Sequence, residues 1–181
     1  MDDAEDVLDF WFVEHGKDDW FGGAPEFDTL LAERFADLHP LVARGEAWTW
    51  RKTPQGRLAE IIVLDQFSRQ LHREEAEAFA QDKMALVLAQ EALALGADRA
   101  VEREWAPFFY LPFMHAESVM IQDEGVRLYE AYGDQEQLDF MRKHREAIAR
   151  FGRFPFRNAA LSRPSTPEEA QYMAEAGDRR F

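Results

Sequence analysis

Residues 144–158 read HREAIARFGRFPFRN, a stretch in which a helical pattern stops and a different pattern begins. In its first half, apolar residues and a histidine recur at every third or fourth position, which is the spacing of one face of an α-helix. Gly152 is the residue type that most often ends a helix in the left-handed conformation. Beyond it, arginine alternates with phenylalanine, and Pro155 favours an extended backbone at the residue before it. The stretch therefore predicts a helix over 134–151 and an extended strip over 153–158.

Side chains in an extended strip point alternately to opposite sides. Arg153 and Arg157 would then face one way, while the phenylalanines and Asn158 face the other. Two guanidinium groups on one side are well suited to binding a carboxylate or a phosphate. They are equally suited to binding helix-end carbonyls and acids such as Asp65, so a ligand-binding and a structural interpretation are both open.

The charge of the chain reverses around the same stretch. The whole protein has a formal charge of −14, yet residues 142–163 contain seven basic residues and one acid, Glu146, so this segment carries +6 and the remainder −20. Such a reversal requires either acids folded back against the segment or an anionic ligand bound by it. The seven basic residues are Arg142, Lys143, Arg145, Arg150, Arg153, Arg157 and Arg163.

The composition predicts an all-α fold. Ala, Leu, Glu, Arg and Gln dominate, β-branched residues are scarce, and no run alternates as a half-buried strand does. We expect a single domain over 1–181 with a frayed tail at 176–181, built as an array of antiparallel helical hairpins. About seven helices are predicted, over 3–14, 26–44, 54–71, 74–95, 103–132 (in two pieces, because it contains two prolines), 134–151, and a short one from residue 166.

Capping residues support several of these boundaries. Thr53 followed by Pro54 is typical of a helix N-terminus, and Asp134 is placed to cap the helix that follows it. Thr166 and Glu169 have the spacing of a capping box, in which each side chain accepts a hydrogen bond from the other residue's backbone.

Several classes of protein are excluded or disfavoured by the composition. The chain has no cysteine, which excludes disulfides, thiol nucleophiles and cysteine-based metal sites. The acidic opening MDDAEDVLDFWF does not predict a signal peptide, and no apolar stretch approaches the ~18 residues of a membrane span. A pI of about 4.7 argues against nucleic-acid binding. We expect a cytoplasmic protein with no membrane partner.

One acid lies in an otherwise apolar helix. Residues 58–69 are apolar nearly all round, which predicts a buried helix, and Asp65 shares the face of its isoleucines. Because a buried carboxylate must be paired or neutralised, we expect it to pair with Arg69 one turn later, or with an arginine of the 142–163 segment. Alternatively, Asp65 is an acid or a ligand orienter in a polar pocket that Gln66 also lines.

The histidines provide candidates for acid–base chemistry. His115 follows an aromatic run and precedes Glu117 by two positions, about 200° around a helix, so the two cannot bind one metal ion in regular geometry. His144 lies on the apolar stripe of its helix. Each is interpreted either as a core histidine or as an acid, base or anion donor. His15 and His39 are expected at the surface or in loops.

No motif indicates a metal or a cofactor. The histidines, Asp65 and Glu117 lack any recognised metal-ligand spacing, and the chain contains no P-loop, dinucleotide-binding glycine pattern, H-E-x-x-H, G-x-S-x-G or EF-hand loop. The sequence therefore predicts neither a metal site nor a cofactor.

Three blocks of the sequence together resemble one bacterial family, catalogued as domain of unknown function 924. They are Leu64-Asp65-Gln66-Phe67-x-Arg69, Phe113-Met114-His115-x-Glu117 and His144-Arg145-x-x-Ile148-x-Arg150-Phe151-Gly152-Arg153-Phe154-Pro155-x-Arg157-Asn158. The resemblance covers about residues 4–175. It implies an all-helical, tetratricopeptide-like fold and no established activity, substrate or cofactor. The chain departs from the family pattern at Ser68, where proline is expected, and at Phe156, where histidine is often expected.

We therefore predict a binding module for an anionic small molecule or an acidic peptide group. The predicted ligand-binding residues are Gln66, Arg69, His115, Arg153, Arg157 and Asn158. One alternative is a hydrolase or phosphoryl-handling enzyme; its catalytic candidates are His115, His144, Asp65 and Glu117. Another alternative is a protein–protein adaptor in which the Arg/Asp/His cluster is purely structural. The oligomeric state does not follow from the sequence.

Overall fold

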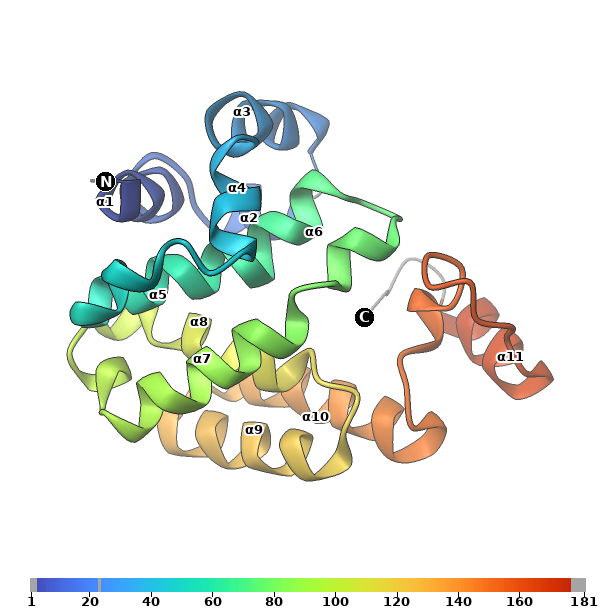
Figure 1. Ribbon diagram of the computed structural model, residues 1–181. Coiled ribbons are helices and arrows are strands. Elements are labelled where there is room, and N and C mark those ends of the chain that lie inside the picture. The colour runs from blue at the N-terminus through green and yellow to red at the C-terminus, as the bar shows by residue number, and fades with distance from the viewer. Residues whose placement is uncertain (1–2, 23, 177–181) are drawn as a thin grey trace. The chain divides into compact units, whose positions relative to one another are not determined.

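The computed structural model describes residues 3–22 and 24–176, and in that part of the chain every regular element is helical (Figure 1). The chain divides into two compact units. The N-terminal unit comprises residues 1–73 and 77–112, and the C-terminal unit comprises residues 74–76 and 113–181. The predicted all-α class is confirmed. The single domain and the tetratricopeptide-like arrangement remain predictions, and the predicted frayed tail lies, beyond residue 176, outside the described residues.

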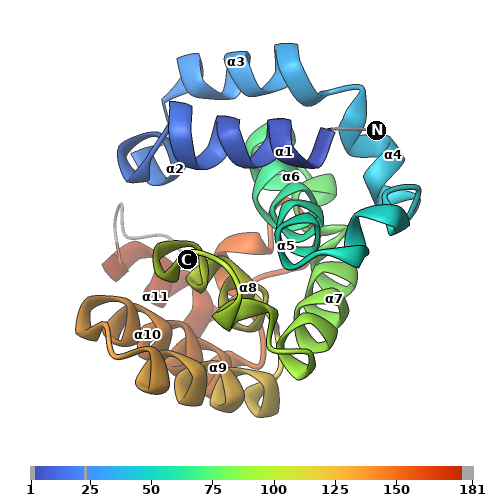
Figure 2. The same cartoon turned by 90° about the vertical axis from the view of Figure 1, so that its left-hand side faces the viewer.

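The elements from the N-terminus to residue 114 are short. They are α1 (Asp3–Leu8), a π-helical turn (Asp9–Glu14), α2 (Lys17–Gly22), α3 (Pro25–Phe35), α4 (Leu38–Ala43), a 3-10 turn (Trp48–Lys52), α5 (Pro54–Ile62), a second π-helical turn (Val63–Phe67), α6 (Ser68–Leu71), a 3-10 turn (Ala76–Phe79), α7 (Asp82–Ala94), two further 3-10 turns (Ala97–Arg99 and Arg103–Trp105) and α8 (Pro107–Met114). In Figure 2, α5 is viewed nearly end-on, with α7 beside it, and the two helices are in contact.

The run from α5 to α6 is the buried centre of the N-terminal unit, as predicted. Thr53 caps it by accepting a hydrogen bond from the backbone N–H of Gly56, 3.0 Å away. Every residue from Leu58 to Phe67 is buried, including three polar ones. Aromatic rings pack around its far end, where Phe67 contacts Phe35 with ring centroids 5.0 Å apart. Burial on all sides explains why the pattern is apolar all round.

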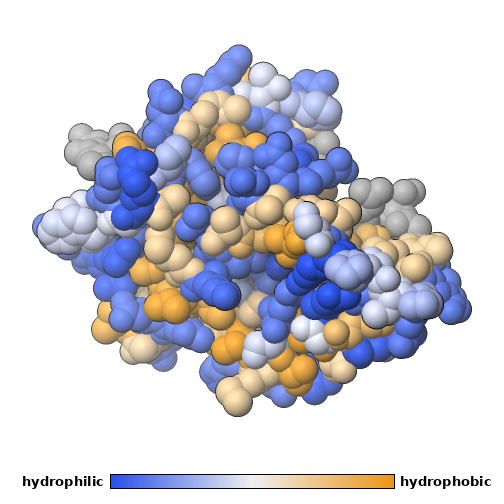
Figure 3. Space-filling model, turned by 45° about the vertical axis from the view of Figure 1, so that its right-hand side comes forward, coloured by the Kyte–Doolittle hydropathy of each residue, from blue (hydrophilic) through white to orange (hydrophobic). Residues whose placement is uncertain are grey.

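The C-terminal unit is built on an antiparallel hairpin, α9 (Val119–Tyr132) with α10 (Gln135–Phe151), which lie side by side in Figures 1 and 2. Gly133, at φ 86°, ends α9, and the Asp134 side chain caps α10. A 3-10 turn (Pro155–Arg157) and α11 (Pro167–Ala176) follow. Hydrophilic and apolar residues are interspersed on the face of the molecule in Figure 3, as on ordinary protein surfaces.

The prediction of about seven helices is wrong, because several predicted helices are interrupted. Helix 26–44 divides into α3 and α4 around Ala36 and Asp37. Pro40 explains this break, since proline has no N–H and its ring clashes with the carbonyl four residues earlier. Helix 74–95 begins as α7 only at Asp82, and Glu74 has a φ of 63° that does not fit a right-handed helix. No described helix is both long and apolar enough to cross a bilayer.

Candidate functional site

The structure distributes the predicted site residues over the two units. Asp65, Gln66 and Arg69 belong to the N-terminal unit. The other predicted residues belong to the C-terminal unit: His115, Glu117, His144, Arg153, Arg157 and Asn158. Each unit therefore contains a polar cluster of its own.

In the N-terminal unit, Arg69 lies between two acids. Its guanidinium is 3.2 Å from the Asp65 carboxylate and 2.9 Å from that of Asp82, and it also donates to the Asp65 carbonyl at 2.6 Å. The Gln66 amide donates to the Asp65 carboxylate at 2.5 Å. Burial by itself lowers the pKa of Arg69, but the two carboxylates raise it above its ordinary value. The predicted Asp65–Arg69 pair is confirmed.

His39 is buried, so its expected place at the surface or in a loop is wrong. Its Nε2 lies 2.8 Å from the hydroxyl of Ser68, which itself donates to the Leu64 carbonyl at 2.7 Å. Burial, followed by the nearby His72, lowers the pKa of His39. Ser68, at the position where the family resemblance led us to expect proline, thus ties α4 to the run from α5 to α6.

In the C-terminal unit, acids of the same unit lie against the basic segment. Each acid lies outside residues 142–163 in sequence. The pairs are Arg142–Glu130 at 2.9 Å, Arg145–Asp123 at 2.8 Å, Arg150–Glu168 at 2.9 Å, Arg153–Glu169 at 2.6 Å and Arg163–Glu117 at 2.7 Å. Of the two explanations that the charge reversal left open, folded-back acids are the one seen here.

The most enclosed of these acids is Glu169, which is only 2% exposed. Arg153 donates two hydrogen bonds to its carboxylate, at 2.6 and 2.8 Å, and the backbone N–H of Thr166 donates a third at 2.8 Å. The Asn158 amide adds a longer contact at 3.3 Å. We call this set of donors (Arg153, Asn158 and the Thr166 N–H) the carboxylate cradle. The predicted Thr166–Glu169 capping box is confirmed by the reciprocal bond from Glu169 N–H to Thr166 Oγ1, at 3.2 Å.

The cradle strongly favours the ionised carboxylate. Hydrogen bonds from Arg153, and then from the Thr166 backbone, lower the pKa of Glu169 from 4.5 to about 2, against the opposing effect of its burial. A carboxylate that accepts several hydrogen bonds, one set of them from a cation, shows this behaviour. The cradle therefore discriminates between an anion and its neutral acid.

Glu117 is held by a second arginine beside the cradle. Its carboxylate accepts hydrogen bonds from Arg163 at 2.7 and 2.9 Å and from the Phe154 N–H at 2.8 Å. Burial would raise its pKa, but the bonds from Arg163 and Phe154 outweigh burial and lower it. Arg163 also donates to the Asn158 side-chain oxygen at 3.0 Å, which joins the two ion pairs.

The strip after Gly152 is not extended throughout, contrary to prediction. Pro155–Arg157 form a 3-10 turn, with Pro155 at its first position, where its fixed φ suits a helical turn. Arg153 and Arg157 consequently meet different partners. Arg157 lies over the Phe154 ring, 4.5 Å from its centroid, and donates to the His115 carbonyl at 3.1 Å.

His144 lies in the core of the C-terminal unit, as the apolar stripe predicted. It is 5% exposed, and its ring packs against the rings of Phe140 and Phe154, at centroid distances of 5.0 and 5.7 Å. Its Nδ1 is 2.9 Å from the Phe140 carbonyl, one turn earlier. A carbonyl can only accept, so Nδ1 carries the proton and the ring is fixed by its own helix.

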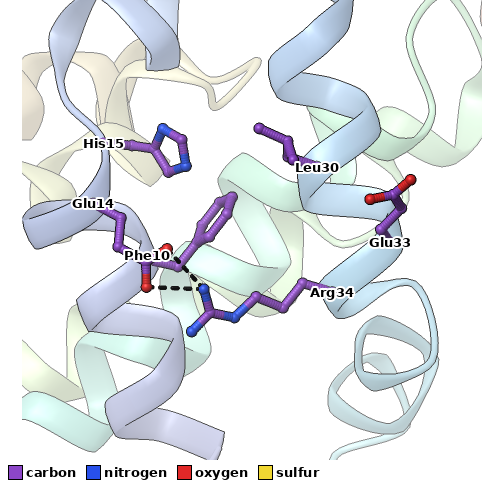
Figure 4. Close-up of a pocket in the computed structure, with 6 residues that line it drawn as sticks. All are labelled: Phe10, Glu14, His15, Leu30, Glu33 and Arg34. Carbon is purple, nitrogen blue, oxygen red and sulfur yellow. Dashed lines mark hydrogen bonds and ion pairs between the residues drawn. The ribbon is translucent and has the colours of Figure 1, made fainter.

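One open pocket was not anticipated from the sequence. It has a volume of about 420 Å³ and lies in the N-terminal unit, where His15 and Arg34 line it (Figure 4). The local signal for it was the i, i+4 spacing of His15 and Asp19, which are 3.0 Å apart. Within residues 3–22 and 24–176, no three histidine or acidic side chains are grouped so as to hold a metal ion.

The chain belongs to the family described as "Bacterial protein of unknown function (DUF924)", which it matches over residues 7–177. A solved structure, the protein of unknown function ATU0120 from Agrobacterium tumefaciens, has 41% sequence identity and a TM-score of 0.90, covering 95% of this chain and 97% of that one. No curated protein matches the chain. The predicted family is thus confirmed.

Proposed function

We propose that the protein is a binding protein that recognises a carboxylate, either on an acidic peptide segment or on a small anionic molecule, through the carboxylate cradle. In the structure, the protein's own Glu169 occupies the cradle. An arginine that presents two parallel N–H donors, with an amide beside it, is a geometry that suits a carboxylate.

The observation that supports this proposal is the way in which α11 is attached. Within Pro167–Ala176, Glu169 is the one buried side chain, and the partly buried Tyr172 packs on the apolar cluster of the C-terminal unit. The neighbouring Arg150–Glu168 pair is exposed, and exposed pairs contribute about 0–1 kcal/mol. Tyr172 adds ring contacts with Phe151 and Phe156, at 5.0 and 6.0 Å. An acidic segment of a partner can compete for the same donors.

The enzyme alternative gains no support from two of its candidates, Glu117 and His144. The Glu117 carboxylate is held ionised in an ion pair, and His144 is fixed by a backbone carbonyl and packed between phenylalanine rings. The adaptor alternative, with a purely structural cluster, expects the same ion pairs as the binding proposal. It differs in expecting that no external anion enters the cradle.

Chemical rescue distinguishes the binding proposal from the adaptor alternative. Glu169→Ala removes the carboxylate and keeps the donors, so formate should fill the space and restore stability. At about ten times its dissociation constant, formate should add about 1.4 kcal/mol, which raises the Tm by about 3–6 °C for a chain of this size. The measurement is thermal unfolding of the full-length variant in sodium formate against sodium chloride at equal ionic strength.

The matched control is Glu168→Ala, which removes the same charge from the exposed neighbour. Formate and chloride should affect this control equally. If formate stabilises Glu169→Ala no more than it stabilises the control, the cradle accepts no external carboxylate, and the adaptor interpretation replaces the proposal.

A further inference from the structure

The open pocket of the N-terminal unit has one rigid wall and one charged wall. Phe10 and Glu14 come from the π-helical turn Asp9–Glu14, and His15 follows it directly. Leu30, Glu33 and Arg34 come from α3 on the other side of the opening (Figure 4). Its volume of about 420 Å³ lies within the range of ~300–1,000 Å³ that is usual for small-ligand sites.

The rigid wall is aromatic. The Phe10 ring is 4.5 Å from the His15 ring and 5.1 Å from that of Phe35, and His15 packs edge-on against Phe27 at 4.9 Å. The π-helical turn sets the position of Phe10 and Glu14 at the edge of this cluster, and such turns occur frequently at functional sites. The exposed Leu30 side chain faces the opening from α3.

The charged wall carries more negative than positive charge. Arg34 donates to Glu14 at 2.8 and 2.9 Å and also to Asp6, so two carboxylates share one guanidinium. These hydrogen bonds, first that of Asp6 and then that of Glu14, raise the pKa of Arg34 above its ordinary value, so it stays charged. Glu33 also lines the pocket, but Figure 4 shows its carboxylate turned away from the opening.

His15 contributes an acceptor. Its Nδ1 is 3.0 Å from the Asp19 carboxylate, which also accepts from the Gly16 N–H at 3.3 Å. A carboxylate partner fixes the proton on Nδ1 and leaves Nε2 as an acceptor in the neutral ring. Figure 4 shows that the other ring nitrogen turns toward the opening, on the side of Leu30 and Arg34.

We infer that this pocket is a second binding site, specific for an organic cation: a primary ammonium or a guanidinium group on a short apolar stem. The exposed Leu30 side chain contacts the stem, and Glu14 and the His15 Nε2 accept from the N–H donors. The excess of carboxylates repels anions. A free amine and the Lys or Arg side chain of a basic peptide share this chemistry.

The test is isothermal titration calorimetry of the full-length protein with agmatine and n-butylamine as probes. We expect both cations to bind at concentrations up to about 10 mM, and butyrate, which has a comparable stem and the opposite charge, to give no saturable heat. Glu14→Gln should weaken agmatine binding by about threefold or more. The matched control Glu26→Gln removes an exposed acid of α3 that does not line the pocket and should leave binding unchanged.

A blocked arginine tripeptide in place of agmatine distinguishes the source of the cation. Equal or tighter binding of the tripeptide assigns the pocket to a basic peptide, and binding of agmatine alone assigns it to free amines. The inference is overturned if neither cation binds, if butyrate binds as well as butylamine, or if Glu14→Gln and Glu26→Gln have equal effects.

Discussion

Gly56→Ala should destabilise the protein by about 3 kcal/mol or more. A β-carbon at this position would lie 2.1 Å from the carbonyl oxygen of Trp50 and 2.8 Å from its carbonyl carbon. Both are backbone atoms, so no side-chain rotation relieves the overlap. The Gly56 N–H also donates to the side chain of Thr53, and the Thr53 N–H donates to the same Trp50 carbonyl. These bonds hold the first turn of α5 close to that carbonyl.

Urea unfolding of the full-length protein measures this effect. Gly16→Ala is the matched control, because nothing lies within 4 Å of its β-carbon position. We expect it to change the unfolding free energy by no more than about 1 kcal/mol. Equal effects of the two substitutions would show that the close approach of Trp50 to α5 is wrong.

Arg51→Ala should reduce the unfolding free energy by a comparable amount, because it leaves the buried Glu60 carboxylate without its cationic partner. Glu60 is 1% exposed, and Arg51 donates to both of its oxygens at 2.7 Å. Removing one partner of such a pair costs about 3–5 kcal/mol, since the remaining charge keeps its desolvation penalty. The measurement is the midpoint and slope of chemical unfolding, compared with those of the wild type.

The control is Arg44→Ala, whose pair with Glu46 is about half exposed on both sides and should contribute no more than about 1 kcal/mol. The double substitution Arg51→Met/Glu60→Met should recover much of the lost stability, because it leaves no charge buried. An Arg51→Ala variant as stable as Arg44→Ala would contradict the buried pair.

Local rules predicted the elements that depend on neighbouring residues. The Thr53 and Asp134 caps, the capping box at Thr166 and the buried centre of the N-terminal unit all follow from spacing within one or two turns. The breaks within the predicted helices do not follow from the apolar periodicity. Apolar spacing continues across Ala36 and Asp37, for example, and the break depends on Pro40, whose position alone would have predicted it.

The candidate site was predictable in the same limited way. The Asp65–Arg69 pair lies at helical spacing, and so does the His15–Asp19 pair that marks the overlooked pocket. The partner of Arg153 is 16 residues away and that of Arg163 is 46 residues away. The sequence showed that the basic segment needed anionic partners, but which acids supplied them is a tertiary property that no local pattern encodes.

The proposed function requires that the cradle prefers an ionised carboxylate, and the pKa of Glu169 reports that preference. Because its pKa is lowered in the folded protein, Glu169 stabilises the fold above its ordinary pKa of 4.5, and this contribution is lost as the pH falls toward 2. We would follow its side-chain carboxyl carbon by NMR from pH 7 downward. A carboxylate still ionised at pH 3.5, with a midpoint of about 2, is the result that we expect. A midpoint at or above 4.5 would contradict the cradle and the binding function proposed for it.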